Sequence, residues 1–134
     1  MRNALCCGFL LLLAVVNDGR AQSMNTPDGP CDGVVVTSDL TQCLDLAWEK
    51  ADAALNGTYG QVQRALAMED RKRLVEAQRL WIEYRDATCD AEYRLYKGAT
   101  AGPATRLACL EAETRAREAS LLRSFGWRIG KSGG

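Results

Sequence analysis

The chain has 134 residues, 17 basic and 17 acidic side chains, and no histidine. Its length is that of one domain, and its balanced charge argues against nucleic acid or a membrane surface as the partner. The absence of histidine removes the commonest general base and metal ligand. We therefore predict a protein that is not an enzyme and that binds no cofactor or metal.

Residues 1–21 have the pattern of a cleaved signal peptide. Arg2 gives a positive start, Ala4–Val16 is an apolar run, and Gly19 and Ala21 are the small residues expected before a signal-peptidase site. The run is shorter than the about 20 residues that span a membrane, which disfavours the alternative of an uncleaved membrane tether. We predict cleavage near Ala21 and a mature chain that is periplasmic or secreted, with no stable membrane anchor.

Four cysteines remain in the mature chain: Cys31, Cys43, Cys89 and Cys109. An even number of cysteines in a small exported domain predicts two disulfides. A zinc site is not expected, because the chain lacks histidine and a Cys-x-x-Cys pair. Cys6 and Cys7 lie in the signal segment, so neither is placed to carry a lipid anchor on the mature protein.

Residues 22–39 are predicted to form an N-terminal loop, because prolines and glycines interrupt this segment. A first helix follows, with Ser38 or Thr41 as its N-cap. Its apolar side chains recur at spacings of three and four, the period of a helix with one buried face. They are Leu40, Leu44, Ala47, Ala51 and Leu55. Gly57 and Gly60 each weaken a helix by about 1 kcal/mol relative to alanine, so the helix can bend or break there.

A second helix is predicted from Glu69 or Asp70 to about Tyr96, since early acidic residues suit the N-terminal end of the helix dipole. Residues 97–103 form a turn, and a third helix starts with Pro103 in its first turn. The inner face of the second helix contains Leu74, Ala77, Gln78, Trp81, Ile82, Arg85 and Cys89. The inner face of the third helix contains Leu107, Cys109, Leu110, Thr114, Arg117 and Leu121.

These segments predict an all-α fold. Residues 40–122 form an antiparallel bundle of about three helices joined by short turns. The N-terminal loop precedes this bundle, and a flexible C-terminal tail at 123–134 follows it. A core of this size benefits from two covalent disulfide staples.

The predicted helix positions favour one of the three disulfide connectivities that four cysteines permit. Cys89 lies near the end of the second helix and Cys109 near the start of the third, so they fall at similar heights in an antiparallel pair. Cys31 in the loop is then left to pair with Cys43. The alternative is Cys31–Cys89 with Cys43–Cys109, which would tie the first helix to the third.

Several polar residues occupy helix positions that should be buried. They are Asp52, Gln78, Arg85, Thr114 and Arg117. Buried charges require partners, so the favoured interpretation is that Asp52 or Asp86 pairs with an arginine of this set across the bundle. The alternative is that some of these residues surround a groove that binds a partner.

Three strings carry a family resemblance. They are Ala51-Asp52-x-x-Leu55-Asn56-x-x-Tyr59, Ala77-Gln78-Arg79-x-Trp81-Ile82-x-Tyr84-Arg85-Asp86-x-x-Cys89, and Cys109-Leu110-x-x-x-Thr114-x-x-Arg117-x-x-x-Leu121. The second string is the most specific, and the match spans about Cys31 to Leu121. Over these residues the chain resembles the N-terminal domain family of LprI-type lysozyme inhibitors. The residues of this signature that we interpret as structural are Asp52, Gln78, Trp81, Arg85, Asp86, Thr114 and Arg117.

The resemblance implies an exported, non-catalytic protein-binding domain, because the named member of the family is implicated in inhibiting lysozyme. That member has a lipoprotein cysteine after its signal, which this chain lacks. Lysozyme has two carboxylates in a cleft, and the turn that holds Tyr96, Lys97 and Thr100 is our candidate to enter it. The alternative interpretation of this turn is an ordinary connection between helices.

A second function is kept open beside lysozyme inhibition. The domain would then be a periplasmic scaffolding module, or an immunity-type protein, with a different protein partner. Aromatic side chains such as Tyr84, Tyr93 and Trp127 would serve such an interface. The sequence specifies neither the partner nor the oligomeric state.

Overall fold

The computed structural model describes Met24 and residues 27–131. It contains three helices: α1 over Thr37–Ala65, α2 over Met68–Leu95 and α3 over Gly102–Ile129. No strand occurs in this described part of the chain, so the predicted all-α fold is confirmed. The predicted signal peptide and its cleavage site lie outside the described residues.

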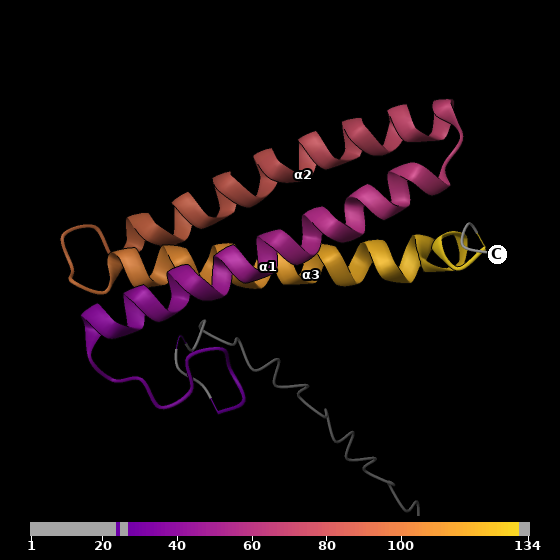
Figure 1. Cartoon of the computed structure of the whole chain (residues 1–134). Helices are drawn as coiled ribbons and strands as arrows, with labels where there is room; N and C mark the ends of the chain where they lie inside the picture. The colour runs from indigo at the N-terminus through magenta and orange to yellow at the C-terminus, as the bar shows by residue number, and fades with distance from the viewer. Residues whose placement is uncertain (1–23, 25–26, 132–134) are drawn as a thin grey trace, which may run out of the picture.

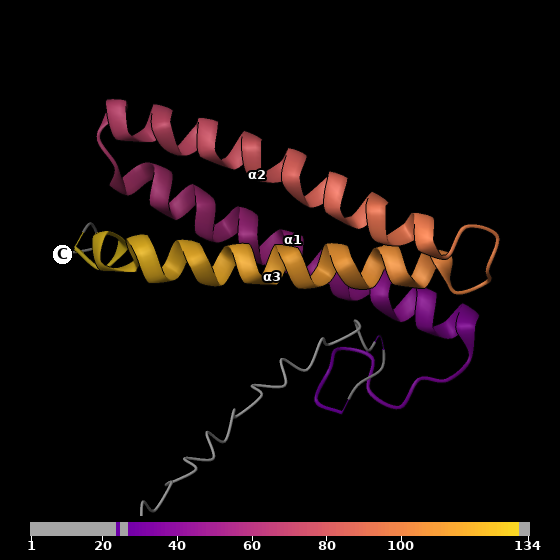
Figure 2. The same cartoon turned by 180° about the vertical axis from the view of Figure 1, so that it is seen from behind.

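α3 is the central helix of the bundle. Consecutive helices run in opposite directions, so that α1 and α3 point the same way and α2 points back (Figures 1 and 2). α3 packs against both of the other helices, and more extensively against α1 than against α2. α2 lies beside α3 at the α2–α3 turn and diverges from it toward the α1–α2 turn (Figure 1). The two ends of the bundle therefore differ in how closely α2 and α3 approach.

The core consists of three buried clusters. The first contains Cys31, Leu40, Leu44, Ala104 and Ala108. The second contains Cys89, Cys109 and Leu110, with Trp48 packed against them. The third contains Leu55, Val62, Leu66, Leu74 and Leu121. The third cluster lies toward the α1–α2 turn, at the end of the bundle away from the α2–α3 turn, and we name it the far core. It contains residues of α1, α2 and α3.

Both disulfides have the favoured connectivity. Cys31 pairs with Cys43 and holds the N-terminal loop against the start of α1, with the Cα atoms 6.0 Å apart. Cys89 pairs with Cys109 and joins α2 to α3, with the Cα atoms 5.5 Å apart. Each bridge links cysteines that are consecutive among Cys31, Cys43, Cys89 and Cys109, and the alternative connectivity is excluded.

α1 begins at Thr37, slightly before the predicted caps. Ser38 and Thr41 lie inside the helix, where the Thr41 hydroxyl donates a hydrogen bond to the Thr37 carbonyl oxygen (2.8 Å). α1 also continues through Gly57 and Gly60 without a break. Buried apolar side chains on both sides of these glycines stabilise the helix against their cost of about 1 kcal/mol each.

The predicted end of the third helix is wrong. α3 continues past residue 122 to Ile129, so residues 123–129 are helical in place of a flexible tail. Phe125 and Ile129 pack against the far core. Their burial favours helix in this segment despite Gly126, because tertiary packing outweighs intrinsic propensity.

The buried face of α2 is narrower than predicted. Leu74, Gln78 and Cys89 are buried, whereas Ala77 and Ile82 are exposed. α2 packs mainly against α3, so a narrow stripe of side chains is enough to cover this contact.

A short connection joins α1 to α2 and depends on one arginine. Arg71, in the first turns of α2, donates from Nε to the Gln63 carbonyl oxygen (2.8 Å) and from Nη2 to the Leu66 carbonyl oxygen (3.2 Å). Carbonyl groups at a helix C-terminus lack partners within the helix. Arg71 supplies partners there and ties the start of α2 to the end of α1.

Candidate functional site

The α2–α3 turn, residues 96–101, holds all three residues predicted to bind a partner. Tyr96, Lys97 and Thr100 are all exposed, at the end of the bundle where α2 and α3 are closest. Leu95, at the last position of α2, is 82% exposed, and Tyr96 is 42% exposed. The turn therefore presents two large apolar side chains next to the ammonium group of Lys97.

Backbone hydrogen bonds fix the shape of the turn. The Tyr96 carbonyl oxygen accepts from the Ala99 N–H (2.9 Å), and the Ala99 carbonyl oxygen accepts from the Gly102 N–H (3.1 Å). Gly98 has a φ of 86°, a conformation that costs about 1–2 kcal/mol for a residue with a Cβ atom. The glycine therefore allows the chain to reverse within this short segment.

Gly102 allows a close approach where α3 begins. A Cβ atom there would lie 3.1 Å from Cε2 of Tyr93 and 3.3 Å from the Tyr96 carbonyl oxygen. The Tyr93 ring thus packs over the first residue of α3. This contact orders the turn from below while Tyr96 stays accessible.

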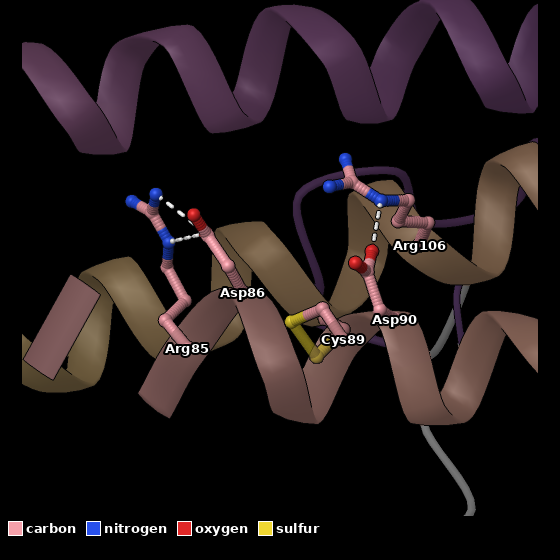
Figure 3. The surroundings of a disulfide bond; sticks show 6 residues. Arg85, Asp86, Cys89, Asp90 and Arg106 are labelled. Carbon is pink, nitrogen blue, oxygen red and sulfur yellow. Dashed lines mark hydrogen bonds and ion pairs between the residues drawn. A yellow bond between two sulfur atoms is a disulfide. The ribbon is translucent and has the colours of Figure 1, made fainter. Parts of the chain in front are cut away.

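Two covalent and ionic links hold the base of the turn (Figure 3). The Cys89–Cys109 disulfide is fully buried between α2 and α3. One residue further along α2, the Asp90 carboxylate accepts a hydrogen bond from Nε of Arg106 on α3 (3.0 Å). The disulfide fixes the spacing of the two helices, and the partly exposed ion pair adds a contact beside it, so the turn projects from a rigid base.

A second group of polar residues surrounds Trp81, and we name it the Trp81 cluster. The guanidinium of Arg85 lies 5.1 Å from the centre of the Trp81 ring, and that of Arg117 lies 5.8 Å from it. Arg117 donates from Nε to Oε1 of the buried Gln78 (3.0 Å). Arg85 pairs with its neighbour Asp86 (2.8 Å). Both side chains of this pair point from α2 toward α1 (Figure 3).

The predicted pairing of buried charges is found only in part. Arg85 has an aspartate partner, but it is adjacent in sequence and not across the bundle. Arg117 contacts an amide, and Asp52 accepts a hydrogen bond from Asn56 one turn away (2.8 Å). Thr114 is fully buried, and its hydroxyl has no hydrogen-bond partner in the described part of the chain.

Burial changes the ionisation of a few groups near these contacts. Burial raises the pKa of Tyr59, and the Arg117 guanidinium opposes that rise. Burial lowers the pKa of Arg117 itself. On the α2–α3 interface, burial and then the charge of Glu113 raise the pKa of Glu92.

Sequence reasoning missed two features of the site. Leu95 ends an amphipathic helix, and nothing in its spacing distinguishes an exposed leucine from a core one. Trp48 packs against the disulfide between α2 and α3, and its indole nitrogen is buried without a hydrogen-bond partner among the described residues. Trp48 follows the buried Leu44 by four residues, and this helical spacing could have indicated the contact.

The described residues contain no group of histidine, cysteine or acidic side chains arranged to hold a metal ion. None of the described helices combines the length and apolar character that crossing a membrane requires.

Comparison with known proteins identifies the family. An uncharacterised protein of Rhizobium meliloti (strain 1021) is 33% identical over 124 residues, which cover 83% of this chain and 87% of the relative. No solved structure matches the chain. Residues 31–121 match the family described as lysozyme inhibitor LprI. This match covers the whole helical core with both disulfides, so the chain belongs to the lysozyme inhibitor LprI family.

Proposed function

We propose that this protein is an exported, non-catalytic inhibitor of lysozyme, and that the α2–α3 turn is the part that enters the lysozyme cleft. Family membership supports lysozyme as the partner. The observation that carries the choice of the turn is its combination of exposure and order. Leu95 and Tyr96 are exposed at the tip, directly above a disulfide and an ion pair.

The chemistry of the turn suits a glycosidase cleft. A lysozyme cleft binds sugar rings around two carboxylates. The Tyr96 ring would occupy a site for a sugar ring, and the Lys97 ammonium would lie against a carboxylate. An ordered turn loses little conformational entropy on binding, which favours affinity. Thr100, which is also exposed in the turn, would contact the rim of the cleft.

Export places the domain where lysozyme acts. Proteins of this family are exported, and we propose that residues 1–21 direct this chain to the periplasm or the outside of the cell, with cleavage near Ala21. The two disulfides fit an oxidising compartment.

The test is a lysozyme turbidity assay with the purified, oxidised chain from Gln22 onward. The protein is titrated against c-type, g-type and i-type lysozymes on cell-wall suspensions. We expect saturable inhibition of one class. Y96A and K97A should each raise the inhibition constant by about 30-fold, the effect of losing a central binding residue. Y84A removes an exposed aromatic of α2 outside the turn and serves as the matched control.

Each result separates the two parts of the proposal. Inhibition that is unchanged in Y96A and K97A would exclude the turn but keep lysozyme as the target. No inhibition of any class, by protein shown to be helical and free of thiols, would exclude these lysozymes as targets. The scaffolding or immunity-type alternative would then be pursued by crosslinking through Tyr84 and Trp127, which are exposed outside the turn.

A further inference from the structure

A groove lies between α2 and α3 at the end of the bundle opposite the α2–α3 turn. It has a volume of about 500 Å³. The α2 and α3 helices diverge toward this end of the bundle (Figures 1 and 2). Its lining comes from the first half of α2, the last half of α3 and the α1–α2 connection. We name it the α2–α3 groove, and its main lining residues are Leu66, Leu74, Ala77, Arg117, Phe125 and Trp127.

The walls of the groove are largely apolar and its charged residues are mostly basic. Leu66 and Leu74 belong to the far core, and Phe125 packs against it. Arg73 and Arg128 also line the groove, together with one acidic residue, Asp70. Asp70 lies 3.9 Å from Arg73, so it already has a cationic neighbour.

Arg117 is a cation without a carboxylate partner in the groove. Within the described chain, its contacts are the Gln78 amide oxygen, the Trp81 ring and the neighbouring Tyr59. Its Nη groups have no acceptor among these residues. A partly buried charge is costly when it lacks an opposite charge, and burial lowers the pKa of Arg117 accordingly. An anion bound beside these Nη groups would remove that cost.

We propose that the α2–α3 groove binds a small organic anion, with its anionic group at Arg117 and its apolar body against Leu74 and Phe125. The volume lies within the about 300–1,000 Å³ usual for small-ligand sites. It suits one ring system or one short acyl chain. The site lies apart from the α2–α3 turn, so it does not depend on the proposed function.

The probe for this site is anilinonaphthalene sulfonate, a fluorescent aromatic anion. N-phenylnaphthylamine has the same rings without the sulfonate and serves as the neutral comparison. Both are titrated into the purified oxidised protein and followed by probe fluorescence and by energy transfer from the tryptophans. Trp127 lines the groove, and the centre of the Trp81 ring lies 5.8 Å from the Arg117 guanidinium. We expect saturable binding at one site and a higher affinity for the anion than for the neutral probe.

Two variants and one control assign the binding. R117Q should weaken anion binding about tenfold, through loss of a charged hydrogen bond, while leaving neutral-probe binding unchanged. R123Q removes the same charge from an exposed position of α3 that does not line the groove, and it should bind both probes like the wild type. A77F fills the groove from an exposed helix position and should abolish binding of both probes.

Several outcomes would overturn the proposal. The first is that R117Q and R123Q change anion binding equally. The second is that the wild type binds the anionic and the neutral probe with equal affinity. The third is that A77F still binds the probes. Because A77F leaves Arg117 in place, it tests the site even if R117Q fails to fold, and circular dichroism checks the fold of both variants.

Recruitment of the protein to phosphatidylglycerol vesicles, lost in A77F, would assign the groove to a membrane lipid. Concentration-dependent dimerisation lost in A77F would assign it to a second copy of the chain.

Discussion

At one end of the bundle, α2 and α3 are joined by a buried disulfide, an ion pair and a turn that contains several backbone hydrogen bonds. At the other end the two helices diverge (Figure 1), and the α2–α3 groove lies between them. There α2 is held by the far core and by Arg71, which binds the last carbonyl groups of α1. One helix pair thus combines a covalent clamp with an open cleft.

The difference shows how a small domain can keep a tip rigid and still have room between its helices. Close packing along the whole of α2 would leave no groove, and uniform divergence would leave the turn unsupported. The disulfide concentrates the restraint at one level of the α2–α3 contact. The apolar contacts of the far core then set the angle between the axes of α2 and α3.

The largest expected effect on stability is that of removing the Cys89–Cys109 disulfide. The double variant C89A/C109A should lower the free energy of unfolding by about 3–5 kcal/mol, because both cysteines are buried and the bridge restrains the unfolded chain. Urea unfolding followed by circular dichroism measures the change. C31A/C43A is the comparison and should lower it by about 3 kcal/mol or less, since Cys43 is only partly buried. A larger loss from the second pair would contradict the role given to the clamp.

A smaller effect is expected at the open end. R71A should lower the free energy of unfolding by about 1–2 kcal/mol, because it leaves two carbonyl groups at the end of α1 without their partner. K72A removes a neighbouring charge whose exposed pair with Glu69 contributes little. Equal stability of R71A and K72A in urea unfolding would show that Arg71 does not hold the start of α2.

The smallest expected effect concerns Glu92 on α2, whose partly buried carboxyl group is influenced by the charge of Glu113 on α3. The pKa of Glu92 is raised in the folded protein by burial and by Glu113, so its contribution to stability is present at low pH and is lost as pH rises through the carboxyl range. E92Q should therefore be more stable than the wild type at neutral pH, by no more than about 0.5 kcal/mol, with no difference at low pH.

Glu76 provides a control of opposite sign for this pH dependence. A hydrogen bond from Arg79 lowers its pKa, so its contribution is present at neutral pH and is lost as pH falls. E76Q should then be slightly less stable than the wild type at neutral pH. Parallel pH series of thermal unfolding for both variants measure the two slopes, and slopes of the same sign would contradict the assignment.

Much of the fold follows from local sequence patterns. Spacings of three and four predict the three helices, and the heights of Cys89 and Cys109 in an antiparallel pair predict their disulfide. The continuity of α1 through Gly57 and the extension of α3 to Ile129 were not predictable in this way. Both depend on apolar burial against other helices. This burial outweighs the low helix propensity of glycine, which costs about 1 kcal/mol per residue relative to alanine.

The sites are less predictable than the fold for a geometric reason. The turn with Tyr96 and Lys97 is visible in sequence as a break between helices, but the exposure of Leu95 depends on how α2 ends. The α2–α3 groove depends on the angle between two helices. No spacing in the sequence encodes that angle, so the sequence favoured Arg117 as a paired residue of a buried face and left a groove around it only as the alternative.

The two disulfides also bear on how the chain matures. Counting from Cys31, the first cysteine is bonded to the second and the third to the fourth. Under the export proposed above, with the N-terminus leading, each of these four cysteines would meet its partner as the next of the four thiols to emerge. An oxidant that acts on thiols in order of their appearance would then produce the connectivity of the structure directly, and the proposed export route would require no disulfide isomerase.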